Sequence, residues 1–254
     1  MKRVLVTGAT GRTGAQVLEK LRRRPAEFQA FGFARVPAKA AALFGDVDGF
    51  FFGDVTAPDT LRPALAGIDA LVILTSSSLR RKAPARPDEK PQFDYAPGGT
   101  PEIVDYLGQK AQIDAAREAG IGHIVLVGSM GGMIADHPLN RLGDGEVLVW
   151  KRKAEACLID SGIDYTIVRP GGLIDQPGGA RELLTGKDDN FLKHPIEGAP
   201  PVIPRADVAE VVVQALLAPQ ARNKAFDLIS KPEESSAGPT TDFAALFAQT
   251  TPGL

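Results

Sequence analysis

The chain has 254 residues, 44% of them apolar and 24% charged, which suits a single α/β domain with its own core. Its 29 basic and 31 acidic side chains leave a net charge of -2, which excludes a general nucleic-acid binder because no basic excess neutralises phosphates. The one cysteine, Cys157, excludes an intramolecular disulfide, and no window approaches the roughly 20 apolar residues of a membrane span.

Short apolar runs alternate with segments of helix length, a pattern that is typical of parallel βαβ units in an α/β fold. The predicted strands are residues 4–6, 29–33, 49–52, 70–74, 124–127, 165–168 and 225–229. The predicted helices are residues 15–24, 39–44, 58–65, 102–119, 146–160, 206–217 and 242–250. Residues 80–101, rich in proline and glycine, interrupt this rhythm and predict a long functional loop. Residues 231–241 are expected to form a linker.

Three spaced glycines, Gly8, Gly11 and Gly14, occupy the turn between the first predicted strand and the first predicted helix. Gly8 permits a tight turn, Gly11 lets the backbone approach a pyrophosphate, and Gly14 lets the helix pack closely on the strand. The helix N-terminus then offers N–H groups and a partial positive charge to the phosphates. A turn that binds no ligand would not need three glycines, each of which costs conformational entropy on folding. A mononucleotide P-loop would require Gly-Lys-Ser/Thr after the turn, and this sequence has none there. The pattern therefore predicts a dinucleotide site.

Basic residues near this turn indicate which dinucleotide binds. NAD sites usually have an acid about 20 residues further on, at the end of the second strand, which holds the ribose 2′-OH. Here that strand is followed by Arg35, while Arg12 lies in the turn and Lys39 adds charge. A guanidinium group can form a fork to a 2′-phosphate. The sequence therefore predicts NADP(H) as the cofactor, with NAD as the alternative.

Asp54 and Val55 follow the third predicted strand, at an edge where open α/β sheets bind ligands. Asp54 could accept a hydrogen bond from the adenine amino group, with Val55 against the ring. An Asx-type cap of the next helix explains Asp54 equally well, so both interpretations stay open.

Several motifs together carry a resemblance to a known family. They are TGATGRTG at residues 7–14, GDVT at 53–56, GSMGG at 128–132, WKRKAE at 150–155, YTIVRPGG at 165–172 and PRADVA at 204–209. As a set they resemble the atypical short-chain dehydrogenases/reductases of the NmrA-like, NAD(P)H-binding type. The similarity points to small plant and algal NAD(P)-binding proteins related to the dehydrogenase-like subunit of the chloroplast import translocon.

This resemblance implies one Rossmann domain over residues 1–254, a doubly wound parallel sheet with helices on both faces. It also implies a small substrate lobe from about residues 80–101 and 173–254. Ser129 is expected to face the nicotinamide, Lys151 its ribose, and residues 170–172 the carboxamide. The full set of expected cofactor residues is Gly8, Thr10, Gly11, Arg12, Thr13, Gly14, Arg35, Asp54, Val55, Thr75, Ser76, Ser129, Lys151, Pro170, Gly171 and Gly172.

Ser129 and Lys151 are also the expected catalytic residues, because the wider superfamily uses Tyr-x-x-x-Lys with a nearby serine. The tyrosine transfers the proton, and the lysine lowers the pKa of that tyrosine. The tyrosine position here, four residues before Lys151, is Val147, which cannot transfer a proton. The candidates for a substitute acid are Tyr95, Tyr106, Asp136 and His137.

Three functions follow as hypotheses: an NADPH-dependent oxidoreductase that reduces a small molecule, an NADP(H)-binding redox sensor or interaction module without turnover, and, third, an epimerase or dehydratase. The three histidines are far apart, so no metal site is predicted, and His123 is expected at the surface. The expected compartment is the cytoplasm, or the plastid stroma if a transit peptide has been removed. A homodimer is left open as the assembly.

Overall fold

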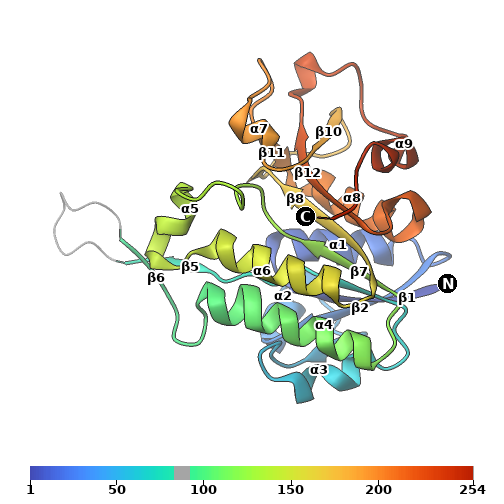
Figure 1. The fold of residues 1–254 in the computed structure, drawn as a ribbon. Coiled ribbons are helices and arrows are strands. Elements are labelled where there is room, and N and C mark those ends of the chain that lie inside the picture. Colours follow the sequence, from blue (N-terminus) through green and yellow to red (C-terminus); the bar gives the residue numbers. More distant parts are fainter. Residues whose placement is uncertain (83–91, 254) are drawn as a thin grey trace.

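The computed structural model describes residues 1–82 and 92–253 and places one large sheet between layers of helices (Figure 1). The spatial order of its eight strands is β10-β12-β8-β7-β4-β1-β2-β3, and only the edge pair β10–β12 is antiparallel among these described strands. The chain order reverses between β1 and β4, which creates the crevice where doubly wound sheets bind ligands. The strands are β1 (Lys2–Thr7), β2 (Phe28–Ala34), β3 (Phe50–Phe52), β4 (Ala70–Ile73), β7 (His123–Val127), β8 (Asp164–Pro170), β10 (Leu183–Gly186) and β12 (Lys224–Ser230).

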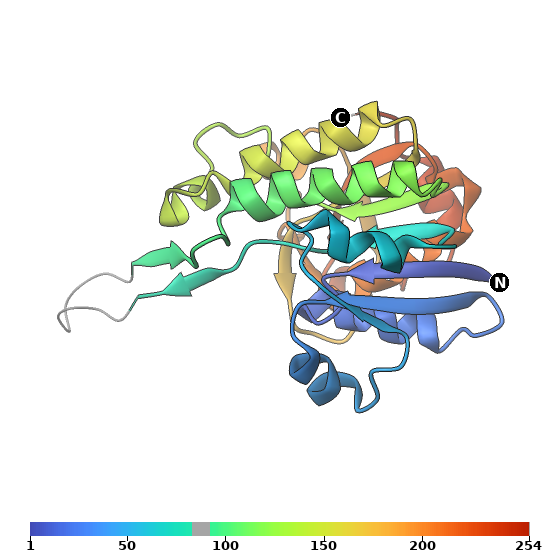
Figure 2. The ribbon, with the colours of Figure 1, turned by 90° about the horizontal axis from the view of Figure 1, so that it is seen from below.

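Helices cover both faces of the sheet (Figure 2). Each face has its own apolar core. Leu18 of α1 and Val212 of α8 are fully buried on one face, while Leu61 of α3, Ile113 of α4 and Leu158 of α6 are buried on the other. Each such side chain stabilises the fold by about 1.5–3 kcal/mol. This arrangement confirms the predicted doubly wound α/β fold. The helices are α1 (Arg12–Arg22), α2 (Pro37–Phe44), α3 (Pro58–Leu65), α4 (Gly108–Glu118), α5 (Pro138–Arg141), α6 (Val147–Asp160), α7 (Asn190–Lys193), α8 (Arg205–Leu217) and α9 (Phe243–Ala248).

Two predicted irregular segments contain structure. The predicted loop 80–101 includes an antiparallel hairpin of β5 (Leu79–Arg81) and β6 (Phe93–Tyr95), while residues 83–91 lie outside the described part. The predicted linker 231–241 connects β12 to α9 with a single 3-10 turn, Glu233–Ser235, and two of its hydroxyl groups bind the backbone at the start of β10. Ser236 Oγ accepts from the Glu182 N–H at 3.1 Å, and Thr240 Oγ1 accepts from the Leu183 N–H at 2.8 Å.

The range 173–254, predicted as part of the substrate lobe, is divided between two places. Helix α8 and strand β12 belong to the main layers, whereas α7 and a small parallel pair project beyond the sheet edge (Figure 1). That pair consists of β9 (Gly172–Ile174) and β11 (Val202–Pro204). It continues from the end of β8, so it forms a wall beside the carboxyl ends of the strands.

His123 is not at the surface, so that expectation is wrong: it lies in β7 with 1% of its area exposed. Its Nε2 is 3.0 Å from Thr166 Oγ1, which itself donates to the Ala221 carbonyl at 2.7 Å. The Thr166 oxygen must therefore accept from His123 Nε2–H. Burial lowers the pKa of His123 to about 3. Among the described residues, no His, Cys, Asp and Glu side chains gather as a metal site would need, and no helix is long and apolar enough for a membrane crossing.

Candidate functional site

The glycine turn connects β1 to α1 in the way its spacing predicts. Gly8 has a φ of +68°, and a Cβ there would lie 2.6 Å from the Leu74 carbonyl oxygen. A Cβ on Gly14 would overlap the Gly8 carbonyl oxygen. Helix α1 begins at Arg12 without a side-chain cap or an acid in its first turn. Its N-terminal N–H groups are therefore available to an anion.

Two adjoining cavities form one cleft along the carboxyl ends of the parallel strands. The larger, about 830 Å³, is lined by the glycine turn, Ser129, Lys151 and residues 170–171. The smaller, about 190 Å³, is lined by Arg35, Asp54 and Val55, among others. Both share a wall made by Thr10, Gly11, Lys39, Leu74, Thr75, Ser76 and Ser78.

Nearly all the expected cofactor residues line this cleft. The exception is Gly172, which lines neither cavity and pairs in β9, where its N–H donates to the Pro201 carbonyl at 2.8 Å. Added Cβ atoms would fill the glycine turn, and the cleft extends from this turn in both directions. Both features fit an extended dinucleotide.

Asp54 has two roles in the smaller cavity. Its Oδ1 accepts from the Thr56 N–H at 2.9 Å and from Thr56 Oγ1 at 2.8 Å, which is an Asx-type turn before α3. Its Oδ2 lies 4.0 Å from Arg35 Nη1. The predicted Asx-type cap is therefore present. The hydrogen bond from adenine stays a prediction, which the cap allows because it occupies only Oδ1.

The structure separates the cations that the sequence grouped around a 2′-phosphate. Arg12 lines only the larger cavity and pairs with Asp175, which also pairs with Arg205 Nη1 at 2.7 Å. Arg35 lines the smaller cavity, and Lys39 lines both. In the described part of the chain Lys39 has no ion pair. Lys39 is therefore better placed than Arg12 to act with Arg35.

Ser129 and Lys151 both line the larger cavity, but each already has a protein partner. Ser129 Oγ donates to the Met130 carbonyl at 2.9 Å. Lys151 Nζ lies 2.7 Å from Oδ1 of Asp105, which is fully buried. Asp105 was not among the site residues predicted from the sequence. The available signal was a polar face, Asp105, Gln109 and Gln112, on a helix expected to pack on the sheet.

None of the four candidate substitute acids lines either cavity. Tyr95 donates to the Leu142 carbonyl at 3.4 Å, and burial, with Asp105 as a second cause, raises the pKa of this tyrosine. Tyr106 stacks on Trp150 at 5.6 Å between ring centroids. The Asp136 side chain is 94% exposed, and His137 Nδ1 accepts from the Leu139 N–H at the start of α5.

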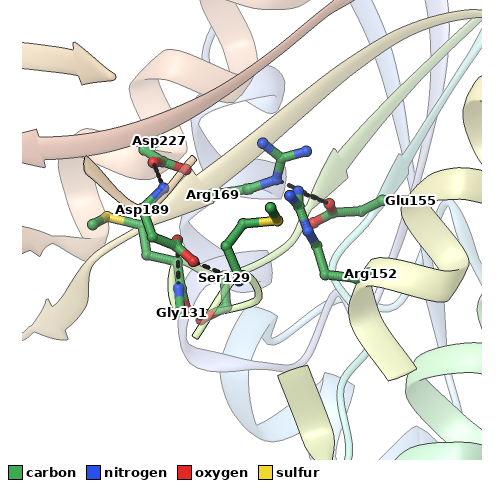
Figure 3. Close-up of polar contacts among 9 residues, drawn as sticks. Ser129, Gly131, Arg152, Glu155, Arg169, Asp189 and Asp227 are labelled. Atoms are coloured by element: carbon green, nitrogen blue, oxygen red, sulfur yellow. Dashed lines mark hydrogen bonds and ion pairs between the residues drawn. The ribbon is translucent and has the colours of Figure 1, made fainter. Parts of the chain in front are cut away.

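The loop that follows β7, residues 128–133, carries Ser129 and is held from two sides (Figure 3). Behind it, Glu155 Oε2 accepts from Arg169 Nε at 2.9 Å and from Arg152 Nη1 at 3.0 Å. A Cβ on Gly128 would overlap Glu155 Oε1, so only glycine lets the loop pass so close to this buried pair.

On the other side, Asp189 holds the same loop by its backbone (Figure 3). Its two carboxylate oxygens accept from the N–H groups of Gly131 and Met133, each at 2.6 Å. The N–H of Asp189 donates to Asp227 Oδ2 at 2.8 Å. Burial, and next the charge of Asp189, raise the pKa of Asp227 to about 6. Asp227 of β12 thus holds Asp189, and Asp189 in turn fixes the loop that carries Ser129.

Comparison with known proteins agrees with this geometry. A family model described as NAD(P)H-binding matches residues 8–219. An uncharacterized chloroplastic protein of Arabidopsis thaliana is 52% identical over 98% of this chain and 75% of its own length. Sanguinarine reductase of Eschscholzia californica is 48% identical over 98% of this chain and 96% of its own length. The chloroplastic TIC 62 protein of Pisum sativum is 33% identical over 67% of this chain and 32% of its own length.

Solved structures share the fold. A Bacillus halodurans protein assigned to the NAD-dependent epimerases/dehydratases is 24% identical, with a TM-score of 0.71 over 98% of this chain and all of its own. Triphenylmethane reductase of Citrobacter, solved with NADP(H), is 20% identical, with a TM-score of 0.59 over 91% of this chain and 70% of its own. The family match confirms the predicted family resemblance and the predicted NAD(P)H cofactor.

Proposed function

Because the chain belongs to the NAD(P)H-binding family, we propose that it is an NADPH-dependent oxidoreductase that reduces a small molecule. The observation that carries this proposal is the continuous cleft, which runs from Arg35 past the glycine turn to Ser129 and Lys151. The 48% identity to a protein named as a reductase supports the same activity.

The residues of the cleft divide the cofactor between them. The N-terminus of α1 binds the pyrophosphate, Arg35 and Lys39 bind the 2′-phosphate, and Asp54 with Val55 binds the adenine. Lys151 holds the nicotinamide ribose, and Pro170 with Gly171 holds the carboxamide. When bound, the cofactor supplies the hydride. Hydride transfer then depends on how closely these residues align donor and acceptor.

The proton, where one is needed, comes from water or from the substrate itself. Val147 occupies the usual tyrosine position, and no described Tyr or His side chain lines either cavity. The Ser129 hydroxyl orients the acceptor, for which it must turn away from the Met130 carbonyl. The favoured acceptors therefore take hydride without a dedicated acid, as quinones, flavins and iminium cations do.

Oxidation of NADPH, followed at 340 nm, tests the proposal across quinones, flavins, aldehydes and sanguinarine. We expect turnover with at least one of the first two classes or with sanguinarine, and little with aldehydes, which need a proton at oxygen. Tight binding of NADPH without oxidation by any acceptor would sink the reductase and favour the redox sensor. An epimerase or dehydratase is the weakest alternative, because it also needs an acid/base pair at the site.

The compartment and assembly belong to the same proposal. The chloroplastic relative supports a plastid location over the cytoplasm. A homodimer stays a prediction, which light scattering of the purified protein would test.

A further inference from the structure

Lys151 is paired with a buried carboxylate that the proposed function has not used. Asp105 Oδ1 lies 2.7 Å from Lys151 Nζ, and the exposed fractions of the two side chains are 0% and 10%. Asp105 Oδ2 accepts from the Ser77 N–H at 3.0 Å. One carboxylate therefore joins the lysine of α6 to the segment that follows β4.

The helical face that carries Asp105 makes two further bonds to this segment. Gln109 Nε2 donates to the Thr75 carbonyl at 2.9 Å, and Gln112 Nε2 lies 3.1 Å from Thr75 Oγ1. Residues 105, 109 and 112 lie on one face because they are four and three positions apart. Thr75 and Ser77 line the larger cavity, so this buried polar face fixes one wall of the cleft.

A π-helical turn, Glu102–Leu107, places Asp105 at the head of this face. Such turns are rare and often occur at functional sites. The neighbouring Val104 lines the smaller cavity, while Asp105 reaches Lys151 at the larger one. The same turn thus supports both ends of the cleft.

We propose that Asp105 is a positioning residue that holds Lys151 in one orientation through their charge pair, and so sets the affinity for the nicotinamide half of the cofactor. The carboxylate lies 2.7 Å from Nζ and so fixes where the ammonium group stands in the cavity wall. With Val147 in place of the usual tyrosine, the lysine has a carboxylate as its partner. Lys151 then binds the nicotinamide ribose, and Asp105 balances its charge. This inference rests on the proposed NADPH function.

The test compares two ligands on the variant Asp105→Asn. Asparagine keeps the shape and an acceptor for the Ser77 N–H but removes the negative charge that faces Lys151. We expect the Kd of NADPH to rise by about 10- to 100-fold. The Kd of adenosine 2′,5′-bisphosphate, which lacks the nicotinamide half, should change by less than about twofold. Calorimetry measures both, and general loss of structure would weaken both ligands equally.

A double-mutant cycle then asks whether Asp105 acts through Lys151. Lys151→Met should weaken NADPH by a similar factor, and adding Asp105→Asn should cost little more, because the interaction is already lost. The control is Asp114→Asn, on the exposed face of α4, where Asp114 pairs with Lys110 at 2.6 Å; it should bind both ligands as wild type does.

The outcomes separate the inference from the function beneath it. If Asp105→Asn binds NADPH as wild type does, the inference is wrong. It is also wrong if the rise in the Kd of NADPH in the double variant equals the product of the rises in the two single variants. Should Asp105→Asn fail to fold, Asp105→Glu decides, because it keeps the negative charge but moves it by one methylene: wild-type affinity for NADPH would overturn the inference, and weaker NADPH binding with an unchanged Kd of the bisphosphate would support it. A wild-type protein that binds neither ligand would overturn the proposed function, and the inference with it.

Discussion

At the scale of single residues, the preference between NADPH and NADH depends on charge in the smaller cavity. Arg35 lines it with 68% of its side chain exposed, and its nearest acid, Asp54, is 4.0 Å away and already bonded to Thr56. The guanidinium group is therefore free to form a fork to a 2′-phosphate.

Replacing Arg35 with glutamate reverses this charge. We expect the Kd of NADPH to rise by about 10- to 100-fold, whereas that of NADH changes by less than about threefold. Fluorescence titration of both cofactors measures the ratio. Arg117→Glu, at an equally exposed position on α4, is the control for charge alone. Equal loss for both cofactors would refute the assignment of Arg35 to the 2′-phosphate.

At the scale of elements, the packing of α1 on β1 depends on the absence of a side chain at Gly14. Its Cβ would overlap the Gly8 carbonyl oxygen, a backbone atom that cannot turn aside. We expect Gly14→Ala to lower the free energy of unfolding by about 1–3 kcal/mol and to weaken NADPH binding, because the turn must open. Gly122→Ala is the control, since its Cβ would meet nothing closer than 4.0 Å. Urea unfolding compares the two, and equal stabilities would contradict the close contact.

The loop after β7 depends on a carboxylate from the start of α7. Asp189 accepts from two N–H groups, and asparagine offers only one such oxygen and turns an NH₂ toward the other donor. We expect Asp189→Asn to lower the free energy of unfolding by about 1–3 kcal/mol and to reduce turnover, because Ser129 lies on that loop. Asp188→Asn is a matched control: it has the same φ of 59° but is exposed. Similar stability of both variants would show that the two bonds contribute little.

Elements and the glycine turn could be predicted from the sequence because their signals are local. Apolar runs, proline and glycine mark the strands of the sheet, and the spacing of Gly8, Gly11 and Gly14 reports a backbone contact within seven residues. Asp105 and Asp189 could not be found in this way. Their roles come from partners distant in the chain, Lys151 and Gly131, and an isolated acid in a sequence is usually a solvated one.

The short strands β9, β10 and β11 were missed for the same reason. Each has three or four residues, too few for a pattern of alternation, and each forms only because a distant segment offers it an edge. Likewise, His123 stands in the sequence as a polar residue at the start of a strand, which predicts exposure. It is buried because Thr166, whose hydroxyl donates to the Ala221 carbonyl, accepts a hydrogen bond from its ring.

At the scale of the whole molecule, two buried groups, Asp227 and His123, should make the free energy of unfolding depend on pH. Their contributions change in opposite directions as the pH rises. Asp227 has its pKa raised from 3.8 to about 6, so the folded protein binds a proton more tightly than the unfolded chain. Its contribution to stability is fully present below pH 3.8 and is lost as the pH rises through 6. His123, with its pKa lowered from 6.5 to about 3, contributes stability above pH 6.5 that is lost as the pH falls toward 3.

The variant Asp227→Asn separates these two contributions, because His123 titrates in both proteins and cancels in the difference. Asparagine keeps an acceptor for the Asp189 N–H but cannot ionise. The raised pKa corresponds to about 3 kcal/mol. We therefore expect the free energy of unfolding of the variant, relative to wild type, to rise by up to about 3 kcal/mol between pH 4 and pH 7.5. Urea titrations at half-unit steps measure the difference. A difference that is constant with pH would mean that Asp227 ionises alike in the folded and unfolded states, and that Arg169 and Arg152 offset its burial beside Asp189 in full.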